Sequence, residues 1–373
     1  MFSKKLRRAV FILFVVLGVM VMGVVGITMG YNYVLKQNDR LNAIREAQTE
    51  ITKDTPNAVM VLIESGDTTS IIAEKLEELT LIENTTIFSL LSKYNGFDGE
   101  YQVGTHYLTP DLSYDEIMHH LTLRAKTVTI RFREGLSYIQ VKEILRENGL
   151  QFNETKLDEM MDSSNDFVDY RFVEMINVSD DRDFILSGYL FPDQYDFDVN
   201  ASERTILNTF LRNTARKIPE EYYERAAYLG MTMDEVIVLA SFIQAEAGGI
   251  EEMFDISGVF HNRLKNENFL KLESCASANY IREIDGLPRV WSATLEDIEL
   301  DHPYNTYYYQ GLPPGPICMP GQDAIAAALY PSNHTYYYFC SNGEGKNVFS
   351  ATRAEHEQKV AMYSPLWTDE DTE

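Results

Sequence analysis

The amino-terminal residues place the strongest constraint on this chain. Four basic residues within 1–8 precede residues 9–30, an uninterrupted run of 22 uncharged and mostly apolar residues. At a helical rise of about 1.5 Å per residue, this run spans the roughly 30 Å hydrocarbon core of a bilayer. Because basic residues flank a membrane span on its cytoplasmic side, we expect residues 1–8 in the cytoplasm and the body of the chain outside the plasma (inner) membrane.

A cleaved signal peptide is the alternative interpretation of this segment. Signal peptides usually carry an apolar region of about 7 to 15 residues, followed by a small-x-small cleavage site. Residues 9–30 form a longer run, and residues 27–31 (Ile-Thr-Met-Gly-Tyr) fit such a site poorly. We therefore favour an uncleaved, single-pass anchor.

The net charge of −25 arises from the part of the chain beyond this anchor, because residues 1–30 are themselves basic. All 57 acidic residues, but only 28 of the 32 basic ones, follow residue 30. Nucleic-acid binding requires clustered Lys and Arg, so this composition argues against a nucleic-acid partner. An acidic body is also repelled by anionic lipid, so contact with the bilayer is expected through the anchor alone.

Cysteine and histidine patterns bear on disulfides and metals. The odd count of three cysteines, Cys275, Cys318 and Cys340, argues against a disulfide framework, although one bridge remains open. The seven histidines form no HExxH or other clustered ligand set. We expect no metal and no cofactor.

An internal repeat lies directly after the anchor region. Residues 59–76 and 127–145 each combine a strand-like run, a Gly turn and a helical pattern, and one offset of 69 residues aligns them without gaps. This regularity predicts two small βα modules. Residues 101–108 are expected to return as a strand in the first module, and residues 113–123 to form a helix.

The remaining patterns predict an α+β protein. Helices are expected at about 203–229 and 233–247, and a core strand at 336–339. The expected organisation is a cytoplasmic tail (1–8), a transmembrane helix (9–30), a membrane-proximal stalk (31–56), a first module (57–124), a second βα module with a connector (125–184), a further folded domain (185–367) and an acidic tail (368–373).

Glu246 is the most promising candidate for chemistry. It follows Leu239, Phe242 and Ile243 at helical spacing, which places it on an apolar stripe in the last turn of its helix. Burial and the helix dipole both disfavour the anion there and should raise its pKa, which suits a general acid. Small residues and two glycines beside it leave room for a ligand. The alternative is a solvated residue at an ordinary helix end.

Rigid, aromatic loops follow downstream. Residues 302–307 and 311–317 combine Tyr and Asn with Gly-flanked prolines, a composition that suits sugar rings edged by hydroxyl groups. The same loops could instead cap the core.

Taken together, six segments resemble the endolytic murein transglycosylase (YceG-like) family, in the family's order and with the anchor in the expected place. The resemblance runs from about Val59 to the carboxyl terminus. The segments are residues 188–195, 239–247, 259–264, 272–276, 303–307 and 311–317.

The resemblance implies that Glu246 is the catalytic acid and that the βα modules are LysM-like. Such enzymes cut peptidoglycan glycan strands internally without water and leave 1,6-anhydro-muramoyl ends. The C6 hydroxyl of the sugar replaces external water, so one carboxyl can serve as acid and then as base. Cell-wall synthesis or division proteins are candidate partners.

Within this resemblance, five residues are candidates for lining the substrate groove: Asn262, Arg263, Ser274, Asn305 and Tyr307. Arg263 could equally be a structural ion-pair partner, and Asn305 a turn residue that bonds its own backbone.

Three positions depart from the family pattern. Ser187 and Gln244 stand where Glu is frequent, and Glu273 stands where Gln is usual. None of them changes Glu246, so activity is still expected, with altered tuning of its pKa.

Two other functions stay open at this point. One is a non-catalytic envelope scaffold that binds glycan through the modules. The other is a hydrolytic glycosidase with a second carboxylate, for which Asp193 and Glu252 are the candidates.

Overall fold

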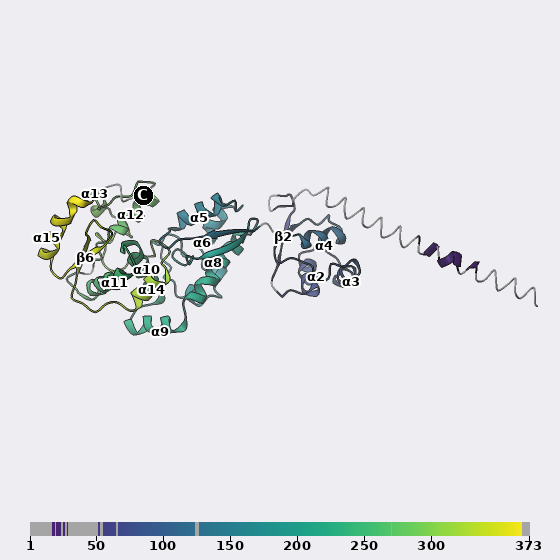
Figure 1. Ribbon diagram of the computed structural model, residues 1–373, viewed down its shortest axis with the longest axis horizontal. Coiled ribbons are helices and arrows are strands. Elements are labelled where there is room, and N and C mark those ends of the chain that lie inside the picture. The colour runs from purple at the N-terminus through teal and green to yellow at the C-terminus, as the bar shows by residue number, and fades with distance from the viewer. Residues whose placement is uncertain are drawn as a thin grey trace, which may run out of the picture. The chain divides into compact units, whose positions relative to one another are not determined.

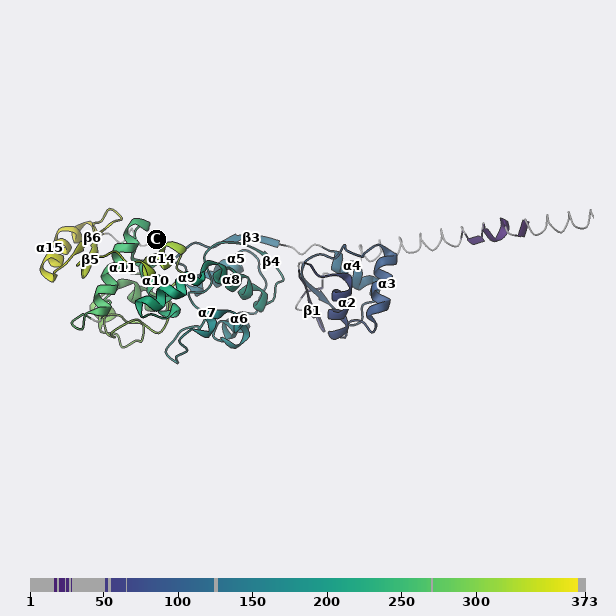
Figure 2. The ribbon, with the colours of Figure 1, turned by 90° about the horizontal axis from the view of Figure 1, so that it is seen from below.

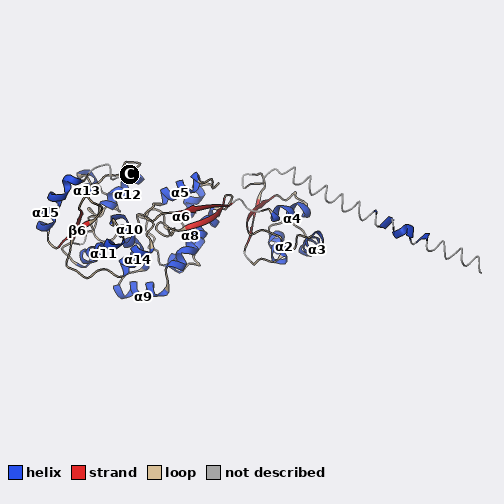
Figure 3. Cartoon of the chain, viewed as in Figure 1, coloured by secondary structure: helices blue, strands red, loops and turns tan. Residues whose placement is uncertain are grey.

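The computed structural model describes residues 51–52, 55–64, 66–123, 127–269 and 271–367, together with scattered positions between 17 and 28. It divides into two compact units, residues 1–124 and 125–373. Figure 3 shows that both units are mainly helical with short strands.

The first unit is a small βααβ module followed by a helix (Figure 1). Its two strands are antiparallel, with Val59 opposite Leu108, and the helices bury apolar side chains against them. Thr68 and Asn84 cap the two helices of the module by accepting hydrogen bonds from the first helical turn. The elements are β1 (Val59–Ile63), α2 (Thr69–Glu78), α3 (Thr85–Asn95), β2 (Gly104–Leu108) and α4 (Tyr114–Thr122).

The second unit begins with the same order of elements. Its α5 and α6 start 69 residues after α2 and α3, and Ser137 and Asn153 provide the matching caps. The two strands again pair antiparallel, but a longer segment with η1 (Asn165–Phe167) and α7 (Arg171–Glu174) precedes the second strand. The elements of this repeat are β3 (Thr127–Arg131), α5 (Tyr138–Glu147), α6 (Glu154–Met161) and β4 (Gln194–Asp198).

Most of the second unit is a helical body that shares one hydrophobic core with this repeat. The β3–β4 pair lies at one end, the β5–β6 pair and α15 lie at the other, and α10, α11 and α14 lie between them (Figures 1 and 2). The elements of the body are α8 (Glu203–Lys217), α9 (Glu220–Leu229), α10 (Met233–Glu246), α11 (Ile250–Lys265), α12 (Cys275–Ile284), α13 (Leu295–Glu299), α14 (Gln322–Leu329), β5 (Tyr338–Ser341), β6 (Asn347–Ser350), α15 (Arg353–Tyr363) and η2 (Ser364–Leu366).

Two expected elements are corrected by the structure. The helix expected over 203–229 is divided into α8 and α9, because Pro219 cannot continue α8 and instead precedes the first turn of α9. The strand expected over 336–339 begins only at Tyr338, and Tyr336 is exposed.

The central helix of the body is α10. From Met233 to Ile243 all of its residues except Glu235 are buried, and it packs mainly against α14 and α11. A helix that is apolar on every side belongs in a core. Glu246 therefore ends a fixed core helix.

Gly188 joins two of the segments that carry the resemblance, and its replacement by Ala is expected to cost about 3 kcal/mol of unfolding free energy. Its φ is +84°, and an added Cβ would lie 2.5 Å from Pro316 Cγ. Gly230→Ala is the matched control, because its φ is +76° but open space surrounds it; we expect about 1 kcal/mol there. Urea unfolding of both variants measures the difference, and equal losses would contradict the steric argument.

The expected membrane span lies largely outside the described residues, as do residues 1–8 and 368–373 and most of residues 31–56. In the described part of the chain, no single helix has the length and apolar composition to cross a bilayer; α9 and α10 meet that criterion only as a pair bent by 89°.

Candidate active site

A buried polar network fixes the start of α10. Asp234 accepts hydrogen bonds from Arg182 Nη1 at 2.8 Å, Arg182 Nη2 at 3.1 Å, the Tyr189 hydroxyl at 2.7 Å and the Asn177 backbone N–H at 3.1 Å. Thr232 and Glu235 add a capping box. The helix that carries Glu246 is thus held at its first turn by charge as well as by packing.

At the other end of α10, the Glu246 carboxyl meets the start of α12. Its Oε1 accepts a hydrogen bond from the Ser274 hydroxyl and another from the Ala276 backbone N–H at 3.1 Å. Among the described residues, no donor binds Oε2. One oxygen of the carboxyl is therefore anchored, and the other can still exchange a proton or a hydrogen bond.

The surroundings of Glu246 favour its protonated form. Burial by the surrounding protein raises its pKa, while the hydrogen bonds from Ser274 and Ala276 and the positive charge of Arg289 act in the opposite direction. The net result is a pKa above the ordinary value for Glu. The residue as a whole nevertheless keeps partial access to solvent. This combination suits a general acid that a substrate can reach.

The segment after α10 is closed by a loop from the β5–β6 pair. The Asn347 side chain donates to the Glu246 backbone carbonyl at 3.1 Å and to Glu252 Oε2 at 3.0 Å. A Cβ on Gly248 would collide with the carbonyl oxygen of Gly345. The Cβ direction of Gly248 is thus filled by protein backbone, whereas Gly249 has open space around it.

A polar cavity of about 220 Å³ lies beside Ala245 and Ala276. Ala276 is the residue whose N–H binds Glu246, so the cavity adjoins the carboxyl. The turn 134–137 of the second module forms one wall, and α12 and residues 317–318 form others. The repeat module thus helps to build the candidate site.

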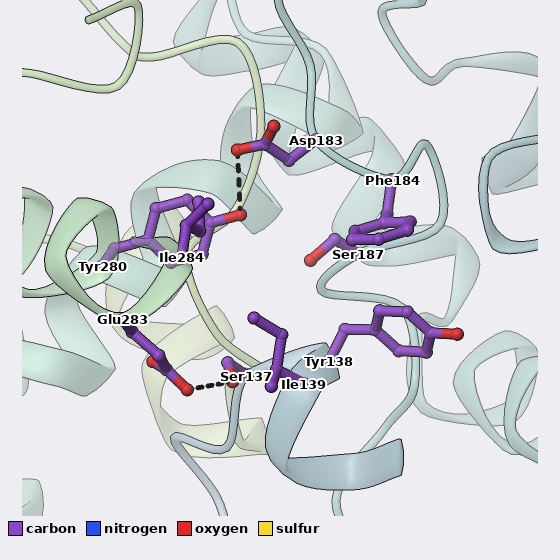
Figure 4. Close-up of a pocket in the computed structure, with 9 residues that line it drawn as sticks. All are labelled: Ser137, Tyr138, Ile139, Asp183, Phe184, Ser187, Tyr280, Glu283 and Ile284. Carbon is purple, nitrogen blue, oxygen red and sulfur yellow. Dashed lines mark hydrogen bonds between the residues drawn. The ribbon is translucent and has the colours of Figure 1, made fainter. Parts of the chain in front are cut away.

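A second, smaller hollow of about 70 Å³ is shown in Figure 4. Ser137, Tyr280 and Glu283 line both hollows, so the two share a wall. Hydrogen bonds brace this wall: Ser137 Oγ donates to Glu283 Oε1 at 2.6 Å, and Tyr280 donates to Asp183 Oδ2 at 3.3 Å. Burial raises the pKa of Asp183.

Two of the five expected groove residues lie close to Glu246. Ser274 binds its carboxyl and caps α12, and the Tyr307 hydroxyl lies 3.1 Å from Sγ of the neighbouring Cys275. The structure therefore brings Ser274 and Tyr307 to the site, and their roles toward substrate stay a prediction.

The other three donate hydrogen bonds to backbone carbonyls, and none of the five expected groove residues lines either hollow. Asn262 holds the carbonyls of residues 334 and 336, each at 2.9 Å. Arg263 holds the carbonyls of residues 271, 272 and 337. Asn305 is fully buried and holds the carbonyls of residues 297, 298 and 300. These contacts position loops around the site.

The structure shows where the three residues that depart from the family pattern lie. Gln244 lines the polar cavity and accepts a hydrogen bond from the Gly321 N–H at 2.9 Å. Ser187 lines the smaller hollow. Glu273 has φ +50° and pairs with Arg263 at 2.8 Å.

Neither candidate for a second carboxylate lines a hollow. Glu252 is bound by the backbone and side chain of Asn347. The Asp193 carboxyl accepts from the Gln194 N–H and Asn213 and lies 3.4 Å from Lys217, contacts that lower its pKa. The carboxyls that do line the polar cavity, Glu134 and Glu283, were missed.

All three cysteines are free, so this structure contains none of the disulfide bridges that they could form. Cys318 is buried in the cavity wall, where burial raises the pKa of its thiol to about 12. It therefore contributes an uncharged surface at neutral pH.

The fold and the site define an α+β protein in which the Glu246 carboxyl, with a raised pKa, adjoins a polar cavity lined by two further carboxyls. The model of the YceG-like family matches residues 61–362. The chain belongs to the YceG-like family.

Relatives and a solved structure agree with this assignment. The chain is 28% identical over 322 residues to the endolytic murein transglycosylase of Bacillus subtilis (strain 168), covering 84% of this chain and 87% of that one. It is 24% identical over 353 residues to the endolytic murein transglycosylase of Streptococcus pneumoniae serotype 2 (strain D39), covering 90% of this chain and 62% of that one, so it spans less than two thirds of that relative. A crystal structure of a yceG-like protein from Listeria monocytogenes superposes with a TM-score of 0.55 at 26% identity, covering 82% of this chain and 99% of that one.

Proposed function

We propose that this protein is an endolytic lytic transglycosylase that cleaves peptidoglycan glycan strands without water, with Glu246 as general acid and then base. The observation that carries the proposal is the Glu246 carboxyl, which has a raised pKa, one anchored oxygen and an adjoining polar cavity. The printed activity of the relatives, endolytic murein transglycosylase, supports the same reaction.

The proposed reaction needs only this one carboxyl. Protonated Glu246 gives its proton to the glycosidic oxygen as the bond from that oxygen to C1 of the muramoyl residue breaks. The carboxylate then takes the proton of the C6 hydroxyl of the same sugar as its oxygen bonds to C1, which forms the 1,6-anhydro ring. The donors at Oε1, Ser274 and Ala276, stabilise the carboxylate between the two steps.

We place the site on the outer face of the plasma membrane, held there by residues 9–30 as a single span. The 22-residue apolar run and the basic residues before it support this placement. We further propose that the two βααβ modules are LysM-like, a proposal supported by their shared element order and matching caps.

Replacing Ser274 with Ala is expected to move the alkaline limb of the pH profile of kcat/KM to higher pH. The Ser274 hydrogen bond lowers the pKa of Glu246, so its loss raises that pKa and keeps the acid protonated over a wider range. Ser202→Ala is the matched control, because Ser202 caps α8 and does not contact Glu246. An unmoved limb in Ser274→Ala, or an equal shift in Ser202→Ala, would contradict this coupling.

The test of the proposed function uses the purified full chain in detergent and uncrosslinked glycan strands. We expect the strands to be shortened from within, as measured by size-exclusion chromatography, and to stay intact with Glu246→Gln. Strands that stay intact with the unaltered protein but sediment with it would instead indicate a glycan-binding scaffold.

A further inference from the structure

The polar cavity beside Glu246 has an uneven set of charges. Glu134 and Glu283 line it, and Glu246 adjoins it. Arg289 is the one cationic side chain among the described residues that line either hollow. Its positive charge opposes the rise that burial causes in the pKa of Glu246 and of Cys318 in the cavity wall. Arg289 thus lines the same cavity as Ala276, the residue whose backbone N–H binds the Glu246 carboxyl.

The loop that carries Arg289 is held on both sides by α12. The Asn279 amide donates to the Val290 carbonyl at 2.9 Å and accepts from the Val290 N–H at 2.8 Å. On the other side, Arg282 Nε donates to the Pro288 carbonyl at 2.7 Å. The backbone on either side of Arg289 is thus fixed to the helix that also lines the cavity.

The backbone around Arg289 is fixed, but within the described residues its side chain has no bonded partner. Arg182 and Arg263 bind carboxylates and backbone carbonyls, and Arg282 pairs with Asp297 at 3.0 Å. Within the described residues, Arg289 forms no ion pair and no hydrogen bond through its guanidinium, and it is exposed. An anchored loop that presents an unpaired guanidinium to a polar cavity is an arrangement suited to an anionic ligand.

We propose that Arg289 binds the carboxylate borne by the lactyl arm of the muramoyl residue at the cleaved bond. This inference rests on the proposed function, because the muramoyl residue is the sugar that receives the new anhydro ring next to Glu246. It is also the sugar of the strand that bears acid groups, since its partner N-acetylglucosamine is neutral. The carboxylate is either that of the lactyl group itself, in strands without peptide, or one in the attached peptide.

Electrostatics favour this assignment. The protein has a net charge of −25, and carboxyls line the cavity, so an anionic strand is repelled unless a cation receives it. A guanidinium can bind both oxygens of a carboxylate at once, which fixes orientation as well as charge. Arg289 would thus set the rotation of the muramoyl ring relative to Glu246.

Binding to the inactive Glu246→Gln chain tests the proposal independently of turnover. Three probes are compared by titration calorimetry: glycan strands with free lactyl carboxylates, the same strands with these groups converted to methylamides, and uncrosslinked strands with peptides. We expect at least one carboxylate-bearing probe to bind about tenfold more tightly than the methylamide, and this preference to vanish in Glu246→Gln/Arg289→Gln. Whichever carboxylate-bearing probe loses affinity identifies the source of the carboxylate.

Two controls keep the result interpretable. Glu246→Gln/Arg204→Gln removes an exposed arginine of α8 that pairs with Asp166 of η1, and it should keep the full preference. Arg289→Lys keeps the charge but cannot bind a carboxylate in a bidentate manner. It should therefore keep part of the preference for carboxylate-bearing probes. An equal loss of affinity for all three probes in the Arg289→Gln chain, or an unchanged preference, overturns the proposal. A failure of the unaltered chain to cut glycan would overturn the proposed function and leave this binding result standing.

Discussion

Replacing Glu246 with Gln is expected to lower kcat/KM for glycan cleavage by about 10³-fold, or about 4 kcal/mol. Gln retains the shape of the side chain and a carbonyl oxygen that can accept from Ser274 and Ala276. It cannot give a proton to the glycosidic oxygen or take one from the C6 hydroxyl, so both halves of the proposed reaction fail. Steady-state cleavage of uncrosslinked strands measures the loss.

The matched control is Glu252→Gln, which alters a carboxyl that accepts from Asn347, the residue that also donates to the Glu246 backbone carbonyl. We expect it to retain most of the activity. A loss in Glu252→Gln comparable to that in Glu246→Gln would indicate a two-carboxylate mechanism and contradict the single-acid account.

Stability provides a second check on Glu246→Gln. The folded-state pKa of Glu246 is raised, so the fold favours the protonated acid, and this contribution is lost as pH rises through that pKa. The difference in free energy of unfolding, Glu246→Gln minus the unaltered chain, should therefore be more positive at pH 8 than at pH 4. Urea unfolding at both values tests the sign, and a relative loss at pH 8 would contradict the assigned environment.

The second large effect is on stability. Asp234→Ala is expected to cost about 3 to 5 kcal/mol and to lower Tm by on the order of 10 °C, because it leaves the Arg182 guanidinium buried without its counter-charge. The two side chains are 2% and 0% exposed, and Tyr189 also loses its acceptor. Differential scanning calorimetry of the full chain measures the change.

Arg204→Ala is the control for that experiment. It breaks the pair with Asp166 at 2.9 Å, in which the side chains are 59% and 42% exposed. Exposed pairs contribute less than about 1 kcal/mol. If Asp234→Ala destabilised the protein no more than Arg204→Ala, the network at the start of α10 would not be what holds this helix in place.

The repeat and its caps could be predicted because their signals are local. Thr68 and Ser137 precede their helices by one residue, and Gly66 and Gly135 have the positive φ values, +98° and +81°, that a Gly turn provides. A fixed offset then relates one module to the other without any knowledge of long-range pairing. Pro219 was a local signal for a helix break, but one helix was expected because the helical periodicity continues on both sides of it.

The location of Glu246 followed from its spacing to apolar residues on one helix, which is again a local property. The cavity did not, because its walls come from residues 134–137, α12, Arg289 and residues 317–318, which only the tertiary fold brings together. The same limit explains why Asn262 and Asn305 were expected to meet substrate. Their amides bind backbone carbonyls, and for Asn262 these belong to a loop more than 70 residues away.

The mass of the new glycan ends, formed in water labelled with oxygen-18, tests the central claim most directly. If the C6 hydroxyl closes onto C1 with Glu246 as acid and base, each new muramoyl end is one water lighter than a hydrolytic end and contains no label. These ends should be absent with Glu246→Gln. New muramoyl ends that retain the full mass of water and carry oxygen-18 would show hydrolysis instead, and would contradict the non-hydrolytic mechanism proposed for this protein.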